Sequence, residues 1–140
     1  MFTDVHEAIA YIESKRSKRS IDAFRDTLNK CHILMKQKNM IHIAGTNGKG
    51  SVSAYIDSIL RQAGYTTALF TSPHLVKINE RFRINFKECS DEELILAWCQ
   101  VKSFMEKGEK QGLQPLTVFE ILFLMGMIIF SQKEIDYCIL

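Results

Sequence analysis

The sequence predicts an α/β domain in which helices flank a mostly parallel sheet built around a glycine-rich loop. An apolar run at 40–44 leads into a glycine-rich segment at 44–51, and a helical pattern follows from Ser51 to Gly64. A run of β-branched and aromatic residues then occupies 65–71. A strand, a loop, a helix and a second strand in this order form a parallel unit. The length of 140 residues corresponds to one domain, residues 1–140.

Two helices are expected before the apolar run. Thr3 or Asp4 caps the first, which extends to about Glu13, and the second begins at Ser20. Their apolar residues recur at helical spacing: Val5, Ile9 and Ile12 in the first, Ile21, Phe24 and Leu28 in the second. The basic run at 15–19 between them is interpreted as a solvated connector, although it could also bind phosphate groups.

The apolar residues of the helix after the glycine-rich loop are Val52, Ile56, Ile59 and Leu60, and Gly64 fits the position that ends it. His42, inside the preceding strand, is interpreted as a packed core histidine. Residues 72–80 show no clear periodicity, and a long segment of this kind is usually functional. Residues 81–85 alternate like a short exposed strand.

The carboxy-terminal half predicts two helices and a strand. Ser90 and Glu93 have capping-box spacing, and the helix from there to about Met105 turns Leu94, Trp98 and Val101 inward. After a polar connector at 107–114, Thr117 and Glu120 repeat that spacing before a helix over 118–131 that is apolar nearly all round and is interpreted as core. Residues 135–140 resemble the start of a buried strand, and we expect the chain to be a fragment of a longer protein.

Composition narrows the functional class. A net charge of +2 does not indicate a nucleic-acid partner, and the longest apolar stretch, 121–130, is shorter than the roughly 20 residues that cross a bilayer. The four cysteines form no metal-binding spacing and are interpreted as reduced thiols of a cytoplasmic protein. No signal peptide is visible. We expect a monomer that contacts neither nucleic acid nor membrane.

The segment 44–51 carries the chemistry of a nucleotide site. Gly48 and Gly50 permit close approach of the backbone to phosphate, Lys49 can reach the outer phosphates, and the hydroxyl of Ser51 could contact Mg²⁺. The match to the common G-x-x-x-x-G-K-[ST] pattern is imperfect, because Ile43 occupies the first glycine position and Gly50 separates Lys49 from Ser51. A plain strand-to-helix turn is the alternative, but it leaves the placement of the lysine without a reason.

Three segments together resemble the folylpolyglutamate synthase/dihydrofolate synthase family, which belongs with the Mur ligases. They read Ile-His-Ile-Ala-Gly-Thr-Asn-Gly-Lys-Gly-Ser at 41–51, Thr-Ser-Pro-His-Leu at 71–75 and Glu-Arg-Phe-Arg-Ile-Asn at 80–85. The resemblance implies an ATP-dependent ligase that joins L-glutamate to the carboxylate of dihydropteroate or folate through an acyl phosphate, with ATP and Mg²⁺ as cofactors. We expect this chain to form the amino-terminal part of the ATP-binding domain, inactive alone, since later metal ligands and a carboxy-terminal domain follow in the family.

The resemblance also implies roles for single residues. Thr46, Asn47, Gly48, Lys49, Gly50 and Ser51 would bind ATP, with Lys49 catalytic. Ser72 would bind the metal, although it could equally be a turn residue before Pro73. Thr117 and Ser14 would contact substrate and His74 would contact substrate or ATP, while Thr117 also suits a helix cap. Glu120 could bind a metal, but the capping role is favoured. The alternatives are a nucleotide-binding switch or phosphotransferase and a Mur-type cell-wall ligase.

Overall fold

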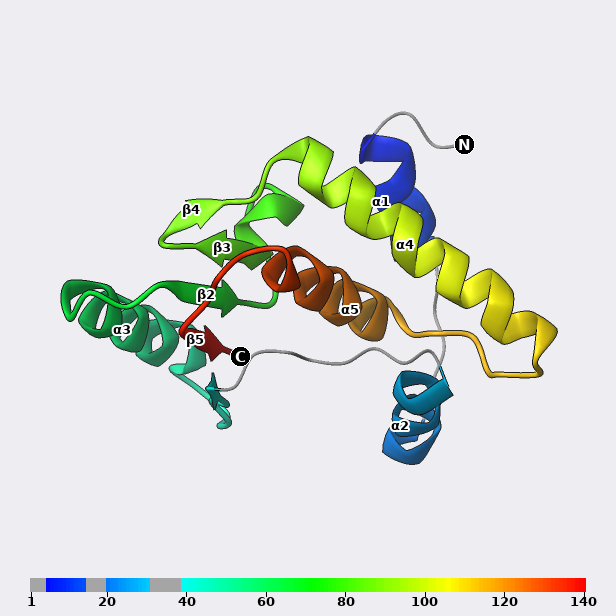
Figure 1. Cartoon of the computed structure of the whole chain (residues 1–140), viewed down its shortest axis with the longest axis horizontal. Coiled ribbons are helices and arrows are strands. Elements are labelled where there is room, and N and C mark those ends of the chain that lie inside the picture. Colours follow the sequence, from blue (N-terminus) through cyan, green and yellow to red (C-terminus); the bar gives the residue numbers. More distant parts are fainter. Residues whose placement is uncertain (1–4, 15–19, 31–38) are drawn as a thin grey trace. The chain divides into compact units, whose positions relative to one another are not determined.

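A computed structural model describes residues 5–14, 20–30 and 39–140 of the chain (Figure 1). The chain divides into two compact units, which are described separately. One consists of Met1–Met35 with Asp91–Met125, and the other of Lys36–Ser90 with Gly126–Leu140. The expected caps Thr3 and Asp4 and the basic connector at 15–19 lie outside the described residues.

The unit with Lys36–Ser90 contains a five-stranded sheet in the order β1-β5-β2-β3-β4. Its strands are β1 (Met40–Ile41), β2 (Thr67–Phe70), β3 (Phe82–Ile84), β4 (Lys87–Glu88) and β5 (Tyr137–Ile139). β5 pairs in parallel with β1 and β2, whereas β3 pairs antiparallel with β2 and β4. The predicted α/β class is confirmed. The sheet is mixed because the chain returns from β2 to β3 through the short 3-10 helix η1 (Ile78–Arg81), and an antiparallel partner needs no crossover helix.

β1 is shorter than the predicted run at 40–44 and lies at one end of the strand order. Pairing nevertheless continues past it, since the Ile43 amide donates to the carbonyl of Leu140 at 2.8 Å. His42 is exposed, so the interpretation as a core histidine is wrong. The side chain lies beyond the end of an outer strand, where no neighbouring strand on that side covers it within the described sheet.

The helix after the glycine-rich loop is α3 (Lys49–Gln62), and Gly64 follows it with a φ of 91°, which confirms the predicted terminating position. Its buried residues are polar, namely Ser53 and Asp57. Of the four predicted apolar residues, Val52 and Ile59 are 44% and 66% exposed, whereas Ile56 and Leu60 are half-buried, so the expected apolar face is only partly formed. The buried positions are four residues apart and therefore lie on one side of the helix.

β3 is not an exposed strand, which corrects the expectation for residues 81–85, because Phe82 is buried and Arg83 and Ile84 are half-buried. Phe82 has no exposed surface, and its ring centroid lies 5.7 Å from that of Phe70. Gly126 of helix α5 (Val118–Ser131) packs on both rings, since a Cβ built there would lie 3.2 Å from Phe82. The alternation at 82–84 is short, and packing against a helix decides burial.

The other unit combines α1 (Val5–Ser14), α2 (Ile21–Lys30), α4 (Asp91–Lys110) and the first half of α5. Trp98 of α4 is 1% exposed, and its ring centroid lies 5.5 Å from that of Tyr11 in α1. The inward positions Leu94, Trp98 and Val101 are confirmed, and α4 continues five residues past the predicted end at Met105. Among the described residues, no helix is both long and apolar enough to cross a membrane.

α2 begins after Ser20, whose hydroxyl accepts a hydrogen bond from the Ala23 amide at 3.1 Å. This bond is the N-cap interaction expected of a serine just before a helix. Ile21 is 78% exposed, so it does not belong to the buried face, where Thr27 is only 5% exposed. Phe24 does pack inward, because its ring meets that of Phe123 edge-on at 6.1 Å.

Candidate functional site

The glycine-rich loop turns directly into the first turn of α3. Gly48 precedes the helix with a φ of 76°, a left-handed conformation that favours glycine, and its carbonyl accepts the Val52 amide at 3.0 Å. The predicted residues at 46–51 are all exposed. The first amides of a helix have no partner inside the helix, and its dipole is positive at this end, so the loop can bind an anion.

Lys49 folds back over this loop. Its Nζ donates to the Gly45 carbonyl at 2.5 Å and to the Thr46 carbonyl at 3.3 Å. The ammonium group therefore lies against the loop that would hold phosphate, and phosphate oxygens can replace the two carbonyls as its acceptors. Such a replacement exchanges neutral acceptors for charged ones, which form the stronger hydrogen bonds.

A second loop leaves the sheet at the same edge. Ile41 of β1, Ile139 of β5 and Leu69 of β2 are aligned across the three parallel strands. The chain continues from β1 into the loop at 44–51 and from β2 into residues 71–77, so both loops follow carboxyl ends of parallel strands. In open α/β sheets this edge is the usual place for a ligand.

Two predicted residues of the second loop are brought together by one that was not predicted. Arg81 is 9% exposed; its Nε donates to Nδ1 of His74 at 2.8 Å and its Nη1 donates to Oγ of Ser72 at 2.8 Å. His74 is half-buried and Ser72 is exposed. The guanidinium group thus links the candidate metal ligand to the candidate substrate-binding histidine.

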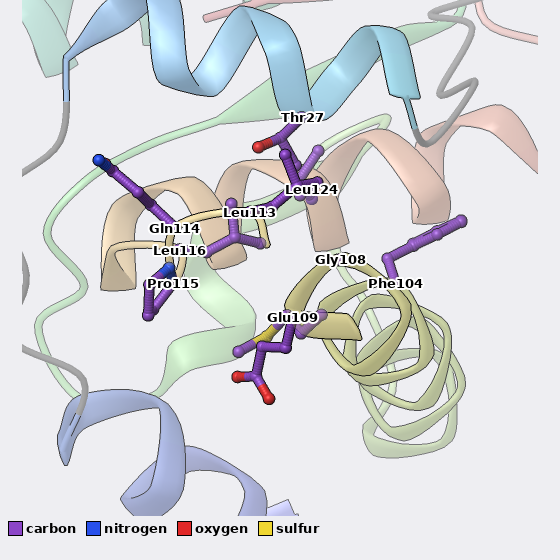
Figure 2. Close-up of a pocket in the computed structure, with 10 residues that line it drawn as sticks. Thr27, Phe104, Gly108, Glu109, Leu113, Gln114, Pro115, Leu116 and Leu124 are labelled. Carbon is purple, nitrogen blue, oxygen red and sulfur yellow. The ribbon is translucent and has the colours of Figure 1, made fainter. Parts of the chain in front are cut away.

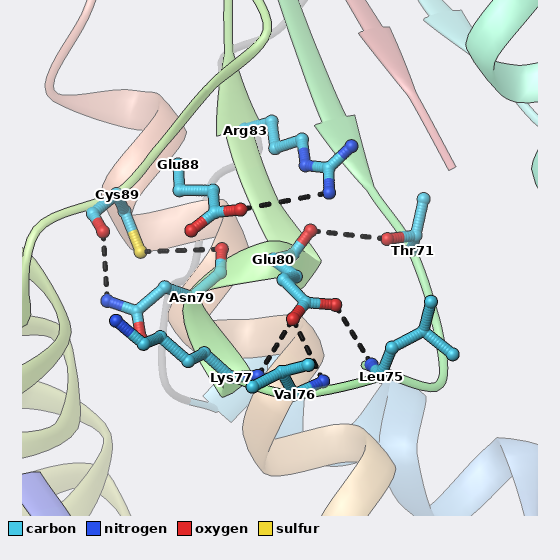
Figure 3. Close-up of polar contacts among 9 residues, drawn as sticks. All are labelled: Thr71, Leu75, Val76, Lys77, Asn79, Glu80, Arg83, Glu88 and Cys89. Carbon is cyan, nitrogen blue, oxygen red and sulfur yellow. Dashed lines mark hydrogen bonds and ion pairs between the residues drawn. The ribbon is translucent and has the colours of Figure 1, made fainter.

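The next part of this loop is held by Glu80 (Figure 3). Its carboxylate accepts the amides of Leu75 at 2.9 Å, Val76 at 2.9 Å and Lys77 at 2.8 Å. The backbone amide of Leu75, then those of Lys77 and Val76, and the charge of Arg83 together lower the pKa of Glu80 from 4.5 to about 2, against an opposing contribution from desolvation. Glu80 is consequently a carboxylate throughout the physiological range.

Sequence reasoning gave Glu80 and Arg81 no role, although both belong to the segment 80–85 that carries the family resemblance. Their contacts reach back three to nine residues along the chain. The only signal in the sequence is an opposite-charge pair placed after a long irregular segment, and such a pair is usually solvated.

The described residues offer few ligands to a metal ion at this site. They contain no group of three histidine, cysteine or acidic residues able to hold one. Ser72 can supply a single hydroxyl oxygen, and Mg²⁺ is commonly bound by one or two protein oxygens together with substrate phosphates. Ser72 therefore fits a metal ion that arrives with a nucleotide.

Thr117, Glu120 and Ser14 belong to the unit with α4. The Thr117 amide donates to Oε2 of Glu120 at 2.7 Å, and the Glu120 amide donates to Oγ1 of Thr117 at 3.2 Å. This reciprocal pair confirms the predicted capping box and gives Glu120 its structural role. Ser14, the last residue of α1, donates its hydroxyl to the carbonyl of Tyr11 at 2.7 Å.

The same unit contains a small pocket (Figure 2). It is lined by residues of α2, α4, α5 and the connector between the last two: Thr27, Phe104, Met105, Gly108, Glu109, Leu113, Gln114, Pro115, Leu116 and Leu124. Glu109 is the single charged residue among them. The pocket thus offers an apolar wall and no pair of groups for acid–base chemistry.

Comparison with known proteins gives consistent results. The chain is 32% identical over 143 residues to the dihydrofolate synthase/folylpolyglutamate synthase of Bacillus subtilis, which covers 99% of this chain and 33% of that protein. A folylpolyglutamate synthase of Arabidopsis thaliana is 38% identical over 104 residues, 73% of this chain and 18% of that protein. No family model matches. The chain spans a third or less of the length of these relatives.

Solved structures agree with these relatives. The folylpolyglutamate synthetase from Lactobacillus casei superposes with a TM-score of 0.89 at 29% identity, covering 99% of this chain and 36% of that one. The FPGS–AMPPCP–folate complex gives a TM-score of 0.87 at 30% identity over 99% of this chain and 35% of its own. A bifunctional folylpolyglutamate synthase/dihydrofolate synthase with Mn, AMPPNP and L-glutamate bound gives 0.86 at 27% identity, over 98% and 32% of the two chains.

Proposed function

Because the chain belongs to the folylpolyglutamate synthase/dihydrofolate synthase family, we propose that it forms the amino-terminal, ATP-binding part of an ADP-forming ligase. The intact enzyme would join L-glutamate to dihydropteroate or folate. The observation that carries the proposal is the position of two loops at the same sheet edge, the glycine-rich loop at 44–51 and the loop with Ser72.

The chemistry explains why a phosphate site is needed. A carboxylate is a poor electrophile until one of its oxygens becomes part of a leaving group. Transfer of the γ-phosphoryl group of ATP makes an acyl phosphate, and the amine of glutamate then displaces phosphate. The enzyme contributes mainly positioning and charge stabilisation to such a transfer.

The loop residues have separate tasks in this scheme. The backbone around Thr46, Asn47, Gly48, Gly50 and Ser51 would cradle the phosphates at the start of α3. Lys49 would exchange its carbonyl partners for oxygens of the transferred phosphoryl group and so stabilise the charge that develops there. We assign the metal site to Ser72, with Mg²⁺ supplying charge neutralisation of the phosphates when it is bound.

The substrate contacts are proposed for three residues. Nδ1 of His74 accepts the hydrogen bond from Arg81, which leaves Nε2 to contact a ligand. Thr117 accepts the amide of Glu120, and its hydroxyl proton remains for a second partner. Ser14 is placed at an exposed helix end. Contacts to the folate-like substrate are their proposed role.

ADP formation by the intact protein tests the proposal. We expect release of ADP that requires both L-glutamate and either dihydropteroate or folate. Three acceptors are supplied in parallel: the pteridine compounds with glutamate, a uridine-nucleotide peptide precursor with its amino acid, and a simple hydroxyl compound. Stimulation by the second or third acceptor alone would assign the protein to a cell-wall ligase or a phosphotransferase and overturn the proposal.

A further inference from the structure

Glu80 and Arg81 are consecutive residues that hold different parts of the same loop. Arg81 binds the side chains of Ser72 and His74, and Glu80 binds the backbone amides of residues 75–77. The Thr71 amide donates to the Arg81 carbonyl at 3.0 Å and closes the base of the loop. Residues 71–77 form no helix or strand, so side-chain contacts must define their conformation.

The contacts of Arg81 decide what the two side chains can offer a ligand. A guanidinium group has donors and no acceptor, so one lone pair of the Ser72 hydroxyl is already used and the other has a fixed direction. Nδ1 of His74 must likewise be an acceptor, which places the proton of the neutral ring on Nε2. His74 then presents an N–H donor to its surroundings.

We infer that Arg81 is a positioning residue, whose buried guanidinium group orients the Ser72 hydroxyl for the metal–nucleotide complex and the His74 ring for the substrate before these ligands arrive. The inference rests on the proposed function. Arg81 itself would contact neither the nucleotide nor the reacting atoms.

Two properties make arginine suited to this task. Its planar group presents Nε and Nη1 in a fixed geometry, so it binds two different side chains at once, which a lysine ammonium does with less angular definition. Its positive charge, with Nη1 2.8 Å from Oγ of Ser72, also disfavours a bare cation at that hydroxyl. The negative charge of a triphosphate offsets this repulsion, so the metal is expected to bind as its nucleotide complex.

The test is nucleotide binding by the intact protein, measured with a non-hydrolysable ATP analogue while Mg²⁺ is titrated. For Arg81→Gln we expect the Mg²⁺ concentration at half-maximal binding to rise about tenfold or more, as is typical when a residue that orients a metal ligand is removed. Binding of the analogue without metal, which depends on the loop at 44–51, should stay unchanged. For Arg81→Lys, the Mg²⁺ concentration at half-maximal binding should lie between those of the wild type and Arg81→Gln.

A double-mutant cycle separates positioning from general structural support. If Arg81 acts through Ser72, then Arg81→Gln should cause no further change in the metal dependence of a Ser72→Ala protein. The matched control is Arg83→Gln, because Arg83 lies two residues away and contacts Glu88 at 3.9 Å and the ring of Phe86 instead. That variant should titrate with Mg²⁺ like the wild type.

Four results would overturn the inference. These are an unchanged Mg²⁺ titration in Arg81→Gln, an equal loss of metal-free and metal-supported binding, additive effects in the cycle, or loss of folding in both the glutamine and the lysine variants. If the wild-type protein binds no ATP analogue at all, the proposed function fails and the inference fails with it. If it binds the analogue normally and only the Arg81 results disagree, the proposed function stands alone.

Discussion

The buried carboxylate of Asp57 accepts a hydrogen bond from the hydroxyl of Thr67 at 2.5 Å and thereby joins α3 to β2. Asp57 is 2% exposed and its other oxygen accepts Nε of Arg61 at 2.9 Å. Because the glycine-rich loop leads into α3 and the loop with Ser72 follows β2, this polar contact joins the helix that ends one loop to the strand that begins the other.

Asp57→Ala should lower the free energy of unfolding by about 1–3 kcal/mol, because it leaves the buried Thr67 hydroxyl without its acceptor. Urea unfolding of the intact protein measures the change. Glu106→Gln provides a control, since that carboxylate is 62% exposed and lies 3.9 Å from Lys102. Its effect should stay within about 0.5 kcal/mol, and equal losses in the two variants would contradict the importance of the buried contact.

The lowered pKa of Glu80 predicts a pH dependence for the loop at 75–77. A carboxyl group whose pKa is 4.5 when free and about 2 when folded binds more protons in the unfolded state. Its contribution to stability is therefore complete above about pH 4.5 and is lost as the pH falls toward 2. Glu80→Gln should be less stable than the wild type at pH 6, and the difference should shrink between pH 4.5 and 2.

Unfolding of the two proteins across this pH range checks the prediction, with Glu88→Gln as the reference. Glu88 lies 3.9 Å from Arg83, with a side chain that is 44% exposed, so its removal should alter the pH profile little. A constant difference between wild type and Glu80→Gln from pH 6 to 2 would show that the three amide contacts do not stabilise the charged form.

The elements were largely predictable because their signals are local. The capping box of Thr117 and Glu120 marks the start of α5, and glycine at position 64 marks the end of α3. Burial was less predictable because it depends on tertiary partners. The apolar Val52 and Ile59 of α3 lie outside, while its polar Asp57 lies inside because Thr67 offers a hydrogen bond there.

The candidate site, too, was predictable where its signal is local and unpredictable where it depends on tertiary contacts. The anion-binding loop at 44–51 is continuous in sequence, so its residue types could be matched to phosphate chemistry. The support of Ser72 by Arg81 depends on a chain reversal through η1, and no spacing rule predicts which of two nearby arginines turns inward. The hairpin that follows directs Arg83 toward Glu88 and Phe86.

Substitution of two helical glycines by alanine should change the stability of the protein in opposite directions. A Cβ on Gly126 would lie 3.2 Å from the fully buried ring of Phe82 and 3.4 Å from that of Phe70, and packed rings yield little. Gly126→Ala should therefore destabilise the protein by about 1–3 kcal/mol. A Cβ on Gly108 would meet the mobile end of Leu113 at 3.2 Å, so Gly108→Ala should gain up to about 1 kcal/mol of helix propensity.

Urea unfolding of the two alanine variants beside the wild type gives both signs in one experiment. Stabilisation by Gly126→Ala would mean that the rings of Phe70 and Phe82 can move apart. Destabilisation by Gly108→Ala would mean that Leu113 has no alternative rotamer in its pocket wall.

Removal of the Lys49 ammonium group is the most direct test of the phosphate loop. In the structure this group donates hydrogen bonds to the Gly45 and Thr46 carbonyls. Shortening the side chain removes both bonds, so the loop must then be held in its conformation by its backbone. The left-handed Gly48 and the first turn of α3 supply that definition. Lys49→Ala should therefore fold normally yet lose at least about 100-fold in glutamate-dependent ADP release, as expected for loss of a charge-stabilising donor.

Lys110→Ala is the matched control, because that lysine is exposed at the far end of α4 in the other unit. Its ADP release should equal that of the wild type. Near-normal turnover of Lys49→Ala would remove Lys49 from the reaction. A Lys49→Ala protein that fails to fold would show instead that the bonds of Lys49 to the two carbonyls hold the loop together, and would shift its role from phosphate binding to structure.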